Sequence, residues 1–123
     1  MRTLGQFYRE KILGRDDLTL RELPDRSGES NVVKDLFGWK LYSGKNFIEC
    51  HSGEEARYLK VFFDAGMMEV KVPADQEYIK SIISELENLK TKIDEVISVY
   101  LDGVLSHKIK EKVRHEVYRE IIS

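Results

Sequence analysis

A stripe of apolar residues at heptad spacing marks the second half of the chain. Its members follow one another at alternating intervals of three and four positions, and they are Ile79, Ile82, Leu86, Leu89, Ile93, Val96 and Tyr100. This spacing brings the side chains to one side of an α-helix and makes a continuous apolar seam. We therefore predict a helix over residues 75–102, with Asp75 as its N-cap and Gly103 just after its end.

A shorter helix is predicted to follow, over residues 107–122 with Ser106 as its cap. Its apolar residues recur every four positions, at Ile109, Val113, Val117 and Ile121. Residues 75–102 hold more acids than lysines, whereas residues 103–123 hold more lysine and arginine than glutamate. Opposite charges on two consecutive helices favour an antiparallel helical hairpin, and they set orientation more than stability.

The first part of the chain begins with a helix and then a strand hairpin. Thr3 and Gln6 have the spacing of a capping box, which predicts a helix over residues 3–13. Alternation of apolar and polar residues predicts a β-hairpin over residues 37–51, with Gly44 in its turn.

A second helix and a last strand follow the hairpin. Ser52 and Glu55 again have capping-box spacing and predict a helix over residues 53–65. Its expected buried face consists of Ala56, Leu59, Phe62 and Phe63, and Gly66 is the expected left-handed cap. Residues 67–72 alternate as a half-buried strand, with Met68, Val70 and Val72 expected on one side.

Two segments fit more than one structure. Leu18, Leu20 and Leu23 match neither the helical nor the strand period within residues 16–23. Residues 32–36, which follow a clear loop, either extend the first strand of the hairpin or form one helical turn.

These elements predict an α+β protein of a single domain, residues 1–123. Residues 1–73 form the α/β part, a small β-β-α-β layer with an N-terminal helix. Residues 74–123 form the C-terminal helical hairpin. If the last two strands of the layer are adjacent and parallel, their crossover is right-handed.

The long helix is the reason to expect a partner. It spans about 42 Å, whereas a compact unit of this size is roughly 30 Å across, so the α/β part cannot cover the whole seam. Ile83 and Ile97 also widen the apolar stripe, which is typical of a bundle. We expect a homodimer or a helical protein partner, with two hairpins forming a four-helix bundle. The alternative is a monomer whose own sheet and last helix bury the seam.

Composition excludes several classes of protein. The formal net charge is -2, which gives no overall attraction to nucleic acid or acidic membranes. One cysteine, Cys50, leaves no disulfide framework or cysteine-based zinc site within one chain. We see no apolar run of a signal peptide or a membrane span and expect a cytoplasmic protein with no membrane partner.

One set of residues resembles the signature of the PD-(D/E)xK nuclease family. It consists of Pro24-Asp25 and the triplet Glu69-Val70-Lys71. The resemblance implies that the acids hold a divalent metal and that the lysine positions or activates water. In that family the acid and the triplet usually lie on neighbouring strands of one hairpin, whereas here a hairpin and a helix intervene. The other interpretation is a strand with solvated charges.

Asp35, Glu49 and His51 form an alternative trio with better hairpin spacing. The remaining histidines, His107 and His115, are too far apart in a helix to share a metal. We therefore predict no catalytic residues, no metal ligands and no cofactor.

A nucleic-acid face is the remaining candidate. Lys108, Lys112 and His115 share one side of the last predicted helix and could contact phosphates. Residues 89–96 also resemble the Ile-Asp-x-x-Val helix of some adenine DNA methyltransferases of restriction systems. The catalytic Asn-Pro-Pro-aromatic motif of those enzymes is missing, so the resemblance implies at most an accessory piece of such a system.

The predicted function is a non-enzymatic interaction or assembly module that dimerises or docks a partner through its C-terminal helical hairpin. The alternative is a nucleic-acid-associated protein, either an accessory binding module of a DNA-processing or restriction-modification system or a metal-dependent nuclease.

Overall fold

The computed structural model of the protein describes residues 2–101. In chain order these residues form α1 (Leu4–Lys11), β1 (Leu18–Glu22), β2 (Ser30–Asp35), β3 (Gly38–Ser43), β4 (Asn46–Cys50), α2 (Gly53–Asp64), β5 (Glu69–Pro73) and α3 (Gln76–Leu101). Helices and two antiparallel sheets confirm the α+β class for this part of the chain. The predicted helix over 107–122, and with it the helical hairpin, lies outside the described residues.

The strands form two sheets rather than one layer. β2, β3 and β4 make an antiparallel meander, whereas β5 pairs antiparallel with β1 in a separate two-stranded ribbon. The predicted succession of strand, strand, helix and strand is present as β3, β4, α2 and β5. The parallel crossover considered for its last two strands is not formed between β4 and β5, because β5 pairs with β1.

Both segments that the sequence left open are strands. Leu18–Glu22 is β1, and its partner β5 is far away in sequence. Ser30–Asp35 is β2, a separate strand that pairs antiparallel with β3, so residues 32–35 neither extend the first strand of the hairpin nor form a helical turn, and Leu36 lies in the turn between the two strands. The turn that joins β2 to β3 is held by Asp35, whose Oδ1 accepts the backbone N–H of Phe37 at 2.8 Å.

The helices begin at the predicted caps. The Thr3 hydroxyl accepts the backbone N–H of Gln6 at 3.1 Å, and the Gln6 side chain accepts the N–H of Thr3 at 2.9 Å, which completes the capping box. The Ser52 hydroxyl accepts the N–H of Glu55 at 3.0 Å at the start of α2. At the start of α3, the Asp75 carboxylate accepts two backbone N–H groups of the first turn. Each cap satisfies donors that the helix itself leaves unpaired.

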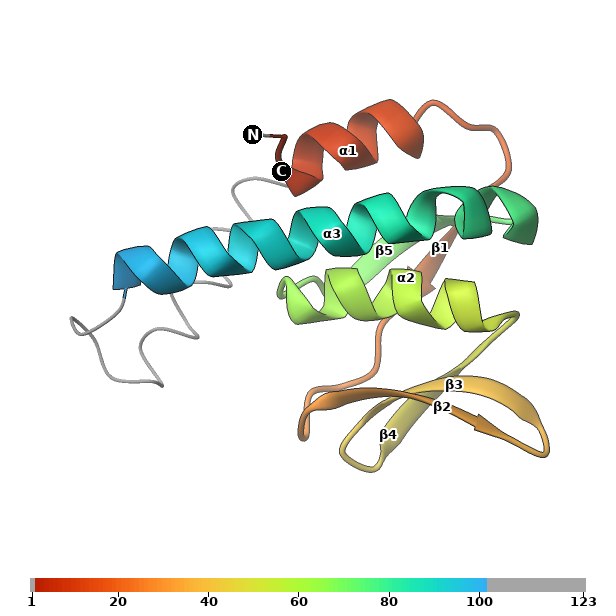
Figure 1. The fold of residues 1–123 in the computed structure, drawn as a ribbon. Coiled ribbons are helices and arrows are strands. Elements are labelled where there is room, and N and C mark those ends of the chain that lie inside the picture. Colours follow the sequence, from red (N-terminus) through yellow and green to blue (C-terminus); the bar gives the residue numbers. More distant parts are fainter. Residues whose placement is uncertain (1, 102–123) are drawn as a thin grey trace.

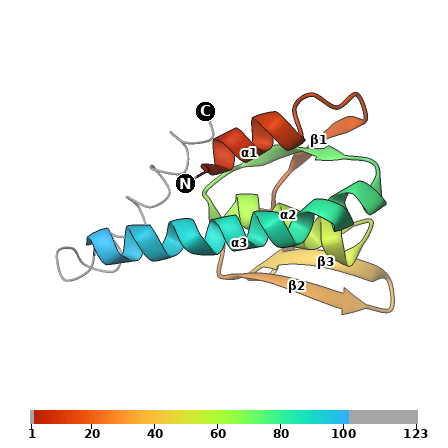
Figure 2. The ribbon, with the colours of Figure 1, turned by 45° about the horizontal axis from the view of Figure 1, so that its top comes forward.

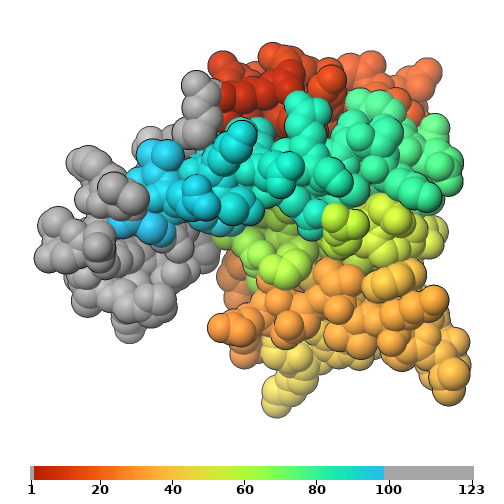
Figure 3. Space-filling model, viewed as in Figure 1, coloured from red at the N-terminus to blue at the C-terminus, as the bar shows by residue number. Residues whose placement is uncertain are grey.

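The three helices lie side by side, with α3 between α1 and α2 (Figure 1). The meander covers the far side of α2, and the ribbon of β1 and β5 lies behind the helices (Figures 1 and 2). In the space-filling view these elements form successive bands, from α1 through α3 and α2 to the meander (Figure 3). The helix α2 is therefore the central element of the described part.

The core lies between α2 and its neighbours. The predicted buried face of α2 is confirmed, because Ala56, Leu59, Phe62 and Phe63 are all buried. The rings of Tyr8 in α1 and Tyr58 in α2 each lie within 5.4 Å of the Phe62 ring, centre to centre. Gly66 has a φ of +93°, as the left-handed cap predicted after α2 requires.

The edge of β5 that faces the helices is closed by two tyrosines. Tyr8 accepts the backbone N–H of Lys71 at 2.9 Å through its hydroxyl oxygen, and the Tyr58 hydroxyl donates to the Lys71 carbonyl at 2.7 Å. Burial is the main cause that raises the pKa of Tyr58. These contacts satisfy backbone groups of Lys71 that would otherwise be unpaired at a strand edge.

One prediction for this strand is wrong. Val70 and Val72 are buried as expected, but Met68 is 79% exposed. The strand begins at Glu69, so Met68 lies in the preceding connection and does not follow the alternation.

Candidate functional site

The heptad seam is largely covered within the chain. Five of its residues are buried in the hydrophobic core, namely Ile79, Ile82, Leu86, Leu89 and Ile93. Val96 is 55% exposed, although it continues the same heptad pattern. The side chain of Tyr100 lies outside the description. The seam therefore has a buried part, residues 79–93, and an open position at Val96.

Polar contacts fix α3 against both neighbouring helices. Towards α1, the Tyr78 hydroxyl donates to the Lys11 carbonyl at 2.6 Å, and the Arg15 guanidinium lies 3.8 Å from the centre of the Tyr78 ring. Towards α2, Arg57 and Glu87 form a two-bond ion pair. The buried part of the seam thus belongs to the fold of this domain.

The C-terminal end of α3, drawn in blue, extends past α1 and α2 (Figure 1). Val96 lies on this extension, and the neighbouring Ile97 is half-buried. Beside the extension lies a hollow of about 770 Å³, lined by Arg2, Glu85, Asn88, Leu89 and Lys92. Leu89 lines this hollow, although only 8% of the residue is exposed.

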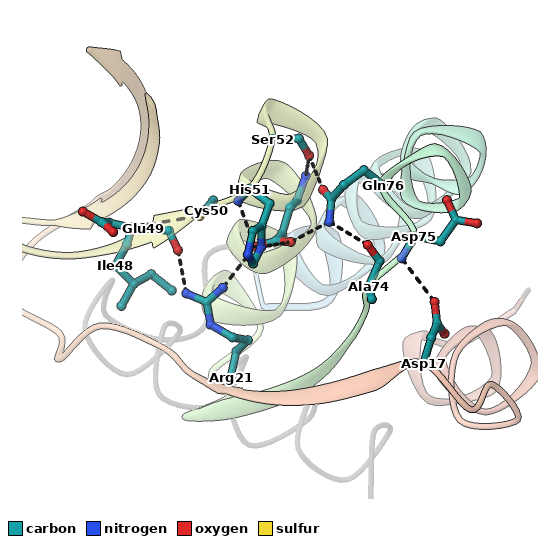
Figure 4. A network of polar contacts seen from close by, with 11 residues as sticks. Asp17, Arg21, Ile48, Glu49, Cys50, His51, Ser52, Ala74, Asp75 and Gln76 are labelled. Carbon is teal, nitrogen blue, oxygen red and sulfur yellow. Dashed lines mark hydrogen bonds and ion pairs between the residues drawn. The ribbon is translucent and has the colours of Figure 1, made fainter. Parts of the chain in front are cut away.

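A second feature is a polar network around the buried carboxylate of Glu55, and Figure 4 labels its partners Arg21, His51 and Gln76. Only 2% of this side chain is exposed. It accepts hydrogen bonds from Arg21 at 3.0 Å and from Gln76 at 2.9 Å, and it lies 3.0 Å from Nδ1 of His51. The Glu55 carboxylate also accepts the backbone N–H of His51 at 3.2 Å.

This network joins four parts of the fold. Arg21 comes from β1, His51 from the end of the meander, Glu55 from α2 and Gln76 from the start of α3. Arg21 also donates to the carbonyl of Glu49 in β4 at 2.6 Å. A buried carboxylate is stable only when charged and polar partners satisfy it, and all of these partners do so. The arrangement is a structural clamp, in which the His51 imidazole is the exposed member.

Cys50 lies next to this clamp and is half-buried. Burial is the main cause that raises the pKa of its thiol to about 11, and the nearby charge of Glu55 contributes. Because the thiolate is the reactive form, this thiol is a poor nucleophile at neutral pH.

The nuclease candidates come only partly together. Asp25 and Glu69 line one hollow of about 440 Å³ at the end of the β1–β5 ribbon, together with Glu22. Lys71 is exposed on β5 and does not line that hollow. Within residues 2–101, no group of three or more histidine, cysteine or acidic residues is placed to hold a metal ion. The alternative trio of Asp35, Glu49 and His51 therefore does not come together as a metal site either.

The three residues of the predicted nucleic-acid face, Lys108, Lys112 and His115, lie outside the described residues.

The outer face of the meander carries a further cluster of side chains, which the local sequence pattern does not indicate. There the rings of Tyr42 and Phe47 lie 5.1 Å apart, and Lys40 Nζ lies 5.1 Å from the centre of the Phe47 ring. Lys40 also donates to Asp35 at 2.7 Å, and this bond is the main cause that raises the lysine pKa. Next to this face, Leu36 and Phe37 in the β2–β3 turn are almost fully exposed.

For the part of the chain that the structure covers, no helix combines the length and the apolar character needed to cross a membrane. Compared with models of protein families, with curated proteins and with solved structures, the chain matches none of them.

Proposed function

We propose that this chain is a non-enzymatic assembly module, in which residues 74–123 form a helical hairpin that joins two copies of the chain. One observation carries the proposal. The seam is buried from Ile79 to Ile93, but α3 continues past α1 and α2 with Val96 55% exposed. When a helix extends beyond the elements that cover it and exposes an apolar side chain, burial of that side chain against a partner is favourable.

The lengths of the helices support this proposal. With 26 residues α3 spans about 39 Å, whereas the 8 residues of α1 span about 12 Å and the 12 residues of α2 about 18 Å. Each neighbouring helix therefore accompanies α3 for less than half of its length. The remaining length is available to the rest of the hairpin and to a partner.

A second copy of the chain suits this extension better than an unrelated partner. A two-fold interface uses the same patch on both subunits, so one open apolar position supplies both sides of the contact. Two helical hairpins that meet in this way form a four-helix bundle. The acidic residues of α3 and the basic residues of 103–123 provide opposite charges for the contact.

The mass of the protein in solution tests the proposal. The chain has a mass of 14.4 kDa, and we expect light scattering at ~100 µM to give twice this value. Val96→Asp places a charge on the open seam position and should reduce the mass to that of one chain. Ser84→Asp is the matched control, because it adds the same charge at an exposed position of α3, and it should leave the mass unchanged.

Circular dichroism of each variant verifies that the helices are retained. A wild-type protein that remains a single chain at ~100 µM would contradict the proposed dimer.

A further inference from the structure

The ribbon of β1 and β5 has one closed edge and one open edge. On the closed edge, the backbone N–H and carbonyl of Lys71 bond to two tyrosine hydroxyls, so these groups point away from β1. Leu20 lies directly opposite Lys71 in the antiparallel register. Residues of such a pair turn their backbone groups in opposite directions, so those of Leu20 point away from β5.

A hydrogen bond at the end of the ribbon agrees with this orientation. The Ala74 N–H donates to the Asp17 carbonyl at 2.9 Å, so the odd-numbered residues of this segment bond towards β5. The even-numbered residues of β1 face the other edge, and they are Leu18, Leu20 and Glu22. Among residues 2–101, β1 pairs with no strand except β5, and no hydrogen bond involves the backbone groups of these three residues.

The side chains along this edge leave it accessible. Leu20 is 54% exposed and lies on the solvent face of the ribbon, opposite to the face with the buried Val70 and Val72. Residues 18–22 contain no proline and no lysine, the residues with which proteins commonly block a strand edge. Unpaired backbone groups next to an exposed apolar side chain form a template for one more strand.

Acidic residues determine which strand fits this edge. Glu22 and Glu69 lie directly opposite each other in the ribbon, where like charges are unfavourable. Asp25 lines the same hollow as these two glutamates. Arg26 lines it too, but its guanidinium donates to two backbone carbonyls. A basic side chain opposite Glu22 on an added strand would therefore meet opposite charge, whereas an acidic one would add a further like charge.

We propose that the free edge of β1 binds an extended segment of another protein by strand addition, with an apolar side chain opposite Leu20 and a basic side chain opposite Glu22. In this mode of binding the backbone hydrogen bonds provide affinity, and the alternate side chains provide specificity. The surface is separate from α3, so the inference does not depend on the proposed function.

A second copy of the chain fits this edge less well. In a two-fold antiparallel pairing centred on Leu20, Leu18 of one copy lies opposite Glu22 of the other. The acidic residues at the end of the ribbon would then gain no basic partner. Charge therefore favours a different protein as the source of the added strand.

A short peptide tests the proposal on the full-length chain. The probe is acetyl-Thr-Lys-Thr-Val-Thr-Val-Thr-amide, whose lysine lies opposite Glu22 and whose first valine lies opposite Leu20 in antiparallel pairing. At saturation we expect amide-hydrogen exchange at Leu20, measured by NMR, to slow by about tenfold, because this N–H gains a hydrogen bond. Exchange at Thr19, which already bonds towards β5, should not change.

Two N-methylated peptides are the matched controls. A methyl group on the first valine replaces an N–H that faces β1 and should weaken binding by about tenfold or more. A methyl group on the threonine before it replaces an N–H that faces away, so binding should be retained. Equal affinity for the two methylated peptides, or no slowing at Leu20 with the unmodified one, would overturn the proposal.

Charge exchange tests the specificity. The wild type should prefer the lysine peptide to the same peptide with glutamate in place of lysine, and Glu22→Lys should reverse this preference. Glu29→Lys is the control, because it makes the same change at an exposed position outside the ribbon and should retain the preference. A wild type without preference would overturn the proposal. So would protection of Leu20 that rises with protein concentration in the absence of peptide, since it would identify a second copy as the occupant.

Discussion

Arg21 and Glu55 form an ion pair at 3.0 Å across 34 positions of sequence, and the carboxylate is almost fully buried. The arginine is 23% exposed, so it keeps some contact with water while it neutralises the buried charge. His51 and Gln76 complete the set of donors. This one carboxylate therefore connects the ribbon, the meander, α2 and α3.

Removing that charge should destabilise the fold. We expect Glu55→Gln to lower the free energy of unfolding by about 2 kcal/mol, because an amide cannot satisfy the donors that now bind the carboxylate. The partial exposure of Arg21 limits the loss. Glu54→Gln is the control, since Glu54 lies in the same turn without this burial, and it should change the value by less than about 0.5 kcal/mol. Urea denaturation followed by circular dichroism measures both, and equal midpoints would contradict the clamp.

The salt bridge between Arg15 and Asp17 predicts a dependence of stability on pH. The hydrogen bond from Arg15 is the main cause that lowers the pKa of Asp17 from 3.8 to about 2. Because the folded-state pKa is depressed, Asp17 stabilises the fold above pH 3.8, and this contribution is lost as the pH falls towards 2. Asp17→Asn should therefore lose less stability than the wild type over that interval.

Asp16→Asn is the control for this experiment, because Asp16 is exposed and adjacent. Urea midpoints at a series of pH values measure the effect. The same slope for the wild type and Asp17→Asn would show that the salt bridge does not contribute.

A leucine-to-alanine substitution can be compared at a buried position of the seam and at an exposed position of the β2–β3 turn. Leu86 is fully buried in the seam, whereas Leu36 is 98% exposed. Leu86→Ala should lower the free energy of unfolding by 2–5 kcal/mol, since it leaves a cavity in the core. Leu36→Ala should change it by less than about 0.5 kcal/mol. Chemical denaturation compares them, and a similar loss at both positions would place the core elsewhere.

Gly44 should not tolerate a side chain. It has a φ of +59°, and an added Cβ would lie 2.7 Å from the carbonyl oxygen of Ser27. Gly44→Ala should therefore cost more than about 1 kcal/mol, from strain and from displacement of the loop before β2. Gly14→Ala is the control, since its Cβ meets nothing within 4 Å. Thermal unfolding measures both, and a fully stable Gly44→Ala protein would refute the close contact.

Local signals predicted the helices well. The caps at Thr3, Ser52 and Asp75 and the glycine after α2 depend on residues within one turn, so their chemistry is visible in sequence. The heptad pattern likewise predicted which side of α3 is buried up to Ile93. It could not indicate which elements cover that side, because packing partners are distant along the chain.

Long-range pairing accounts for most of what sequence missed. Residues 18–22 have no clear period, and they become a strand only because β5 provides a partner. The clamp around Glu55 was hidden for the same reason. Its glutamate was predicted as the second half of a capping box, but its carboxylate instead accepts the backbone N–H of His51 and the guanidinium of Arg21.

The ribbon has a consequence for the order in which the chain folds. Its pairing of Leu18 with Pro73 closes a loop that contains the whole meander and α2. Loop closure costs entropy that rises with the logarithm of the number of free residues, so the closure is easiest after the enclosed hairpins have already formed. The contacts within the meander are short in sequence and can form early. Strand β1 can pair only once β5 is brought close to it. The topology therefore favours a folding nucleus inside residues 30–64, with the ribbon added last.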